Sequence, residues 1–124
     1  MKKRLIGLIC ALVVCAATAK ERQWNFVGAD PRKRDVKLFV DVANIERLNG
    51  QVQVWSLLQN GEAGSSIGRS DIECKTGQAR SLQWTTYEGK MGTGKVLASN
   101  SRSGDWFYVG SGSLLSMLLR VACR

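Results

Sequence analysis

The stretch VKLFVDVANIERLNGQVQVWSLL, residues 36–58, decides the fold. Apolar residues occupy every second position at its start: Val36, Leu38, Val40 and Val42. This period of two predicts a strand that buries one face. Asn49-Gly50 then predicts a two-residue hairpin turn between 45–48 and 51–58, because both residues tolerate a positive φ. The stretch therefore predicts an antiparallel sheet.

The sequence on both sides of this stretch predicts more strands and one helix. Further strands are predicted at 23–27, 70–75, 79–87, 96–98 and 106–109. Residues 60–68 are rich in Gly and Ser and predict a loop. Residues 114–123 are good helix formers, with Ser111 or Ser113 as the N-cap, and the apolar positions nearly encircle the helix. We therefore expect an α+β fold: an antiparallel β-sheet of about five to six strands, a C-terminal α-helix largely buried against it, and one disulfide.

The segment that precedes Lys20 has the order of a secretory signal. A basic segment, Lys2 to Arg4, precedes an apolar run over 5–16, which is too short to span a bilayer. Ala17-Thr18-Ala19 then offers small residues at the two positions that a signal peptidase reads. We therefore predict a signal peptide at 1–19 and a single envelope domain at 20–124.

An alternative N-terminus is a lipid-modified cysteine. Cys15 would become the first residue of a lipoprotein, but Val14 is a poor residue to precede a lipidation site. The predicted protein is therefore exported and soluble after cleavage at Ala19, in the periplasm or on the outer-membrane surface. The lipoprotein remains the second interpretation.

Two of the four cysteines remain after this cleavage, Cys74 and Cys123. An even pair in an oxidising compartment predicts a disulfide. Closing a loop of this length stabilises the fold by about 4 kcal/mol in the chain-entropy model. Since the chain contains no histidine, the usual zinc tetrad is excluded as an alternative.

The residue types argue against an enzyme. Without histidine, the Ser-His-Asp and Cys-His nucleophile systems are excluded. Asp71 and Glu73 share a strand face, which we interpret as a solvated face. Residues 89–95 match G-x-x-x-x-G-K, but Val96 follows where a P-loop needs Ser or Thr, so the segment is interpreted as a hairpin turn. We predict no catalytic site, no metal and no cofactor.

The densest positive charge after the leader is the candidate binding patch Arg32, Lys33, Arg34 and Lys37. Loss of the three leader cations lowers the net charge from +8 to +5, which still favours acidic partners. The patch is either a contact for an acidic protein, polysaccharide or headgroup, or a solvated loop. Nucleic acid is not expected, because the chain has no recognisable binding motif.

Four tryptophans, at 24, 55, 84 and 106, have two interpretations. They could form a stacking platform for carbohydrate. We expect instead that at least two lie in the core between sheet and helix, because Trp is largely buried on average.

These elements together resemble the surface-adhesin protein E family of Gram-negative envelope proteins. The matching features are Val40-Asp41, Ile45, Asn49-Gly50, Val52, Val54-Trp55, Cys74, Arg80, Tyr87, Trp106, Gly112-Ser113 and Cys123. The resemblance implies the same sheet, helix and disulfide, and a function in binding host vitronectin, laminin and plasminogen. Asp41, Ile45, Trp55, Tyr87 and Trp106 are interpreted as framework, since none corresponds to a known ligand contact.

The sequence thus predicts an exported, non-enzymatic binding protein of the cell envelope. The alternative is a periplasmic accessory or inhibitor protein with no host ligand. No transmembrane segment is expected in 20–124, and a homodimer is left open.

Overall fold

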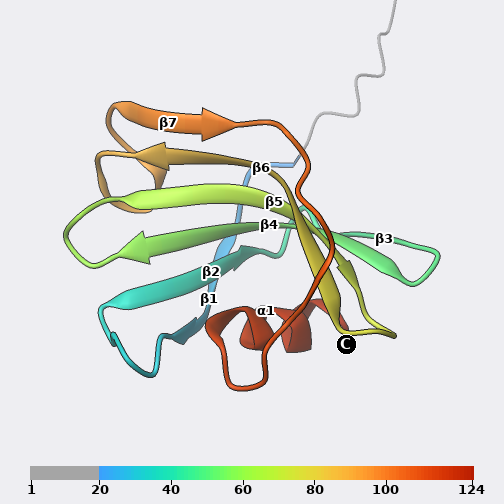
Figure 1. Cartoon of the computed structure of the whole chain (residues 1–124). Helices are drawn as coiled ribbons and strands as arrows, with labels where there is room; N and C mark the ends of the chain where they lie inside the picture. Colours follow the sequence, from blue (N-terminus) through green and yellow to red (C-terminus); the bar gives the residue numbers. More distant parts are fainter. Residues whose placement is uncertain (1–19) are drawn as a thin grey trace, which may run out of the picture.

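The computed structural model describes residues 20–124 (Figure 1). The predicted signal peptide and Cys15 lie outside the described residues. The elements in chain order are β1 (Trp24–Ala29), β2 (Val36–Asp41), β3 (Glu46–Leu48), β4 (Gln51–Asn60), β5 (Ser65–Glu73), β6 (Gln78–Tyr87), the 3-10 turn η1 (Lys90–Gly92), β7 (Val96–Asn100), β8 (Phe107–Tyr108) and α1 (Leu114–Ala122).

The strands form one antiparallel sheet, which confirms the predicted α+β class. Its main path runs β1-β2-β4-β5-β6-β7, while β3 pairs with β4 and β8 pairs with β6. The eight strands exceed the predicted total of five to six, although the short strands β3 and β8 lie within segments 45–48 and 106–109, each predicted as a strand.

The predicted hairpin turn is confirmed, whereas the predicted loop at 60–68 is wrong in its second half. Asn49 and Gly50 have φ angles of 52° and 79° between the paired residues Leu48 and Gln51. The second turn is shorter than expected, because β5 already begins at Ser65 and pairs with β4 along its whole length. Pairing with a long, half-buried neighbour thus overrides the weak strand preference of Ser and Gly.

The core lies between the sheet and α1. Figure 1 shows α1 below β1 and β2, on one side of the sheet. The buried cluster there consists of Leu38, Val40, Val52, Val54, Ile72, Ala79, Leu118 and Ala122. The expectation that most of the helix is buried is wrong: only Leu118 and Ala122 of α1 are buried. The other apolar helix residues pack at the margin of the core, half-exposed.

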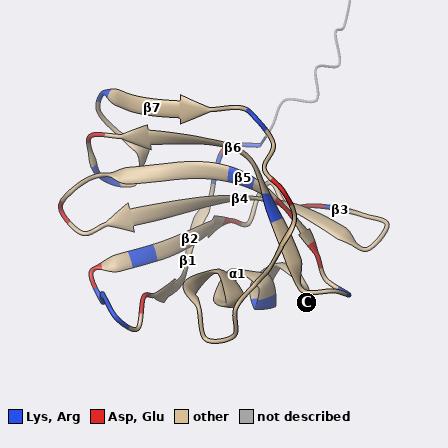
Figure 2. Cartoon of the chain, viewed as in Figure 1, with Lys and Arg blue, Asp and Glu red and all other residues tan. Residues whose placement is uncertain are grey.

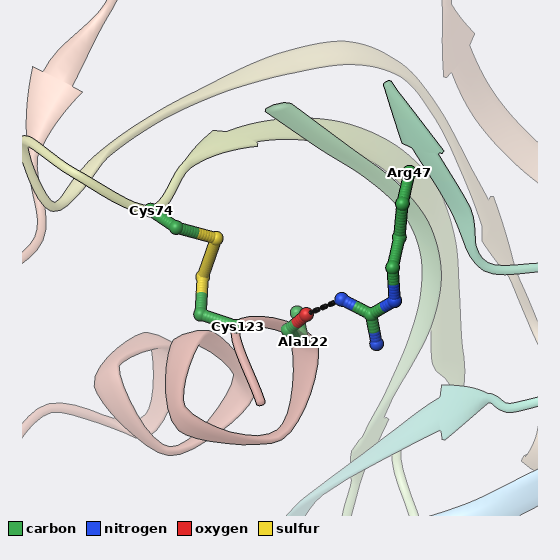
Figure 3. Close-up of a disulfide and its surroundings, with 4 residues drawn as sticks. All are labelled: Arg47, Cys74, Ala122 and Cys123. Carbon is green, nitrogen blue, oxygen red and sulfur yellow. Dashed lines mark hydrogen bonds between the residues drawn. A yellow bond between two sulfur atoms is a disulfide. The ribbon is translucent and has the colours of Figure 1, made fainter. Parts of the chain in front are cut away.

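Both ends of α1 are fixed by side chains. At its start, the N-cap hydroxyl of Ser113 accepts a hydrogen bond from the Ser116 amide at 3.2 Å. This confirms one of the two predicted caps. At its end, the predicted disulfide is confirmed and joins Cys74, just after β5, to Cys123 (Figure 3). Beside it, Nη1 of Arg47 donates to the carbonyl of Ala122, one of the free carbonyls at the helix end. Residues from β3 and from the end of β5 therefore hold the end of the helix.

Within residues 20–124, no helix has the length and apolar character needed to cross a membrane.

Candidate functional site

The cations Arg32, Lys33 and Arg34 lie exposed in the loop between β1 and β2. The loop is fixed at its base, because the Asp30 amide donates to the Val36 carbonyl at 2.9 Å. The Asp30 carboxylate also accepts a hydrogen bond from the Arg32 amide at 2.8 Å. This second contact is an Asx turn. The backbone of this basic loop is thus ordered by local hydrogen bonds, while its three cationic side chains face solvent.

Lys37, the fourth residue of the predicted patch, lies on a different surface from Arg32. Arg32 lines a hollow of about 340 Å³ together with Pro31 and the segment 111–114 before α1. Lys37 lines another hollow, of about 310 Å³, with Phe39 and Met91 on the side of the sheet away from α1. The structure therefore places Arg32 and Lys37 at different hollows, although both lie in or next to the same exposed loop.

The face of the sheet opposite α1, called the open face here, has its own cluster of cations and aromatic rings. Trp55 points to this face because it is out of phase with the buried Val54 on the same strand. The Arg22 guanidinium lies 4.2 Å from the centre of the Trp55 ring and 5.5 Å from that of Trp24. The Arg69 guanidinium lies 5.7 Å from the Trp55 ring centre. Two arginines therefore contact one indole.

The buried Asp41 carboxylate holds the segment that carries Arg22 next to Trp55. The Asp41 side chain is fully buried, and its oxygens accept hydrogen bonds from the Gln23 and Ala43 amides and from Nδ2 of Asn44. Nη1 of Arg22 lies 3.6 Å from the same carboxylate. Asp41 thus fixes the start of β1 and places the Arg22 side chain over Trp55.

A second group of polar side chains continues the cluster across β5 and β6. Nε and Nη2 of Arg80 donate to Asp71 at 3.1 and 3.0 Å, and Nε2 of Gln53 donates to the other oxygen of Asp71 at 3.1 Å. The Arg80 guanidinium lies 4.8 Å from the Trp106 ring centre. We call Arg22, Trp24, Trp55, Arg69, Arg80 and Trp106 the Arg–Trp row. Asp71 is buried within it, so its interpretation as part of a solvated face is wrong.

The tryptophans are not in the core, contrary to expectation. Trp24, Trp55 and Trp106 are partly buried in the Arg–Trp row, and Trp84 is exposed on β6. Three of the four rings contact an arginine. Trp55 is out of phase with the core residues Val52 and Val54, but alternation alone could not have indicated its exposure, because Leu57 is in phase with Trp55 and is fully buried.

The predicted framework residues divide between the two faces. Asp41, Trp55 and Trp106 meet in or beneath the Arg–Trp row, whereas Ile45 packs against the core. Tyr87 lies at the end of β6, paired with Ser65 and Val96. Sequence reasoning missed Arg22 and Arg69, because they are isolated cations that only the sheet register brings to Trp55.

The described residues form an antiparallel sheet with one helix packed on one face and a disulfide to the helix end. The chain belongs to the surface-adhesin protein E family, whose model matches residues 24–124. Its fold is similar to the crystal structure (form II) of Haemophilus influenzae protein E. The TM-score is 0.62 at 10% sequence identity, and the match covers 83% of this chain and 90% of that chain. No curated protein is found to match the chain.

Proposed function

We propose that this chain is an exported, non-enzymatic adhesin that binds acidic regions of host matrix or serum proteins from the bacterial surface. Membership of the surface-adhesin protein E family supports the adhesin class. The order of charges, apolar run and small residues in 1–19 supports export and cleavage after Ala19. Laminin, vitronectin and plasminogen are the proposed ligands.

The observation that carries the proposal is the geometry of the basic loop. Three consecutive cations, Arg32 to Arg34, are exposed on a loop whose backbone is fixed between two paired strands. A loop on a rigid scaffold is a common place for binding residues, because the scaffold positions them without extra ordering cost. Lys37 is also exposed, but it lines a different hollow from Arg32 and is not counted in this loop.

Several contacts must act together in such a site. An exposed ion pair contributes only about 0–1 kcal/mol, so one cation alone gives little affinity. Salt would weaken the binding steeply, because the Debye length falls from about 10 Å at 0.1 M to about 3 Å at 1 M.

We expect the triple variant Arg32→Ala, Lys33→Ala, Arg34→Ala to lose most of its binding to immobilised laminin, vitronectin or plasminogen. Losing three contacts of about 0.5 kcal/mol each raises Kd by about tenfold. The measurement is equilibrium binding of the full chain to each ligand across a salt series.

The matched control removes three exposed cations elsewhere, Lys75→Ala, Lys95→Ala and Arg102→Ala, and should bind almost as the parent does. Equal losses in both triple variants would mean that net charge, and not the loop, drives binding. Failure of the parent to bind any of the three ligands would favour the periplasmic alternative.

A further inference from the structure

We propose that the Arg–Trp row on the open face is a second binding surface, and that its ligand is a linear sulfated polysaccharide. This inference goes beyond the proposed function, because it requires neither the basic loop nor a host protein. Its basis is the exposed charge of the row, the restricted guanidinium groups and the aromatic rings beside them.

Two cations of the row, Arg22 and Arg80, are more exposed than the carboxylates that they contact. The Arg22 side chain is 39% exposed, whereas its partner Asp41 is completely buried. The Arg80 side chain is 34% exposed, and its partner Asp71 only 10%. Arg22 and Arg80 therefore present positive charge to an approaching ligand, although each has an acidic partner and the exposed Glu46 lines a hollow with Gln53 and Asp71 nearby. Figure 2 shows basic segments on the neighbouring strands β5 and β6.

The guanidinium groups are also held in place before any ligand arrives. Cation–π contact with Trp55 restricts Arg22, at 4.2 Å, and to a smaller extent Arg69, at 5.7 Å, and a planar guanidinium carries its N–H donors at its edge. Nη1 of Arg22 lies 3.6 Å from the Asp41 carboxylate, which is beyond hydrogen-bond distance. Among the described residues, Arg69 donates one hydrogen bond, from Nη1 to Oε1 of Gln53 at 3.3 Å. The donors of the exposed Arg22 therefore remain for an anion at little further ordering cost, whereas Nε of Arg69 is buried without a hydrogen-bond partner.

The placement of the arginines on the rings favours a sulfated polysaccharide over an acidic peptide. The Arg22 and Arg69 guanidinium groups lie 4.2 and 5.7 Å from the centre of the Trp55 ring, so they are no more than about 10 Å apart. A linear polymer with anions on successive sugars could reach both. Its sulfates would accept charge-assisted hydrogen bonds, and the C–H faces of its sugars would pack on the partly buried indoles. A peptide of acidic residues offers less apolar surface to cover these rings.

The test is binding of the full chain to heparin, which serves as the sulfated probe, and to polyglutamate, which is the acidic-peptide probe. We expect heparin to bind, and Arg22→Gln with Arg69→Gln to raise its Kd by about tenfold or more. Arg22→Lys keeps the charge without the planar stack, so it should also weaken binding. Arg102→Gln removes one charge from an exposed loop and should bind as the parent does. Circular dichroism and thermal melting identify any variant that fails to fold. If the double variant fails to fold, the Kd of Arg22→Lys for heparin tests the inference by itself.

Three outcomes would overturn the inference. These are no heparin binding by the parent, equal Kd values for parent and both row variants, or polyglutamate binding that equals heparin binding. The basic-loop triple variant separates the two proposals. If that variant alone loses heparin, the polysaccharide binds at the loop and the row is structural. If it loses laminin, vitronectin and plasminogen but keeps heparin, the two surfaces act independently.

Discussion

Leu118→Asp should prevent this domain from folding. Leu118 is 1% exposed and lies in the cluster formed by β2, β4, β5, β6 and α1. The change removes a large apolar side chain from that cluster, which costs about 2–5 kcal/mol for truncations of this kind. It also buries a carboxylate with no partner, which adds a further cost of several kcal/mol. Since a domain of this size has about 5–15 kcal/mol of stability, the variant should be unfolded or nearly so.

The measurement is far-UV circular dichroism with a urea titration of the purified variant. Arg120→Gln is the matched control, because Arg120 lies on the same helix but is exposed. It should change the free energy of unfolding by no more than about 0.5 kcal/mol. A folded Leu118→Asp protein with an unchanged urea midpoint would show that α1 does not pack on the sheet in solution.

Cys123→Ser should lower the free energy of unfolding by about 2–5 kcal/mol, the usual cost of losing a disulfide in a small exported domain. The bond joins residues 49 positions apart, with a Cα–Cα distance of 5.6 Å. In the chain-entropy model, loss of the bond raises the conformational entropy of the unfolded state, while the folded state is little changed. The Arg47 contact with the Ala122 carbonyl would remain, so the helix end should stay near β3 in the folded variant.

The double variant Cys74→Ser, Cys123→Ser is the control. It should match the single variant, because both lose one cross-link, whereas a free thiol in the single variant adds only local effects. Urea unfolding with and without reductant measures the difference, and thiol titration checks the oxidation state. Equal stability of parent and variant in the absence of reductant would exclude a structural role for the bond.

Local signals made most of the fold predictable. The alternation at Val36 to Val42, the Asn49-Gly50 turn and the Ser113 cap each depend on a few neighbouring residues, and all three appear as expected. The early start of β5 at Ser65 could not be found in this way. It depends on a partner strand that supplies the hydrogen bonds, and the sequence of β5 alone favours a loop.

The candidate site was less predictable, because its contacts cross several strands. Arg22 and Trp55 are far apart in the sequence, and they meet only because β1, β2 and β4 lie side by side. The charge run at Arg32 to Arg34, in contrast, is visible as three consecutive residues. Sequence reasoning therefore favoured the loop and missed the Arg–Trp row, although two of its residues, Trp55 and Trp106, were already among the framework positions.

The proposed adhesin on the bacterial surface is tested most directly by labelling intact cells with a membrane-impermeant amine reagent. Lys33, Lys37, Lys75 and Lys95 are all exposed on the folded domain, so labelling does not depend on unfolding or cleavage. A periplasmic marker protein in the same cells reports whether the outer membrane stays closed. We expect this chain to be labelled while the marker is not. A chain that is labelled only after the outer membrane is opened would contradict the proposal and place the protein in the periplasm.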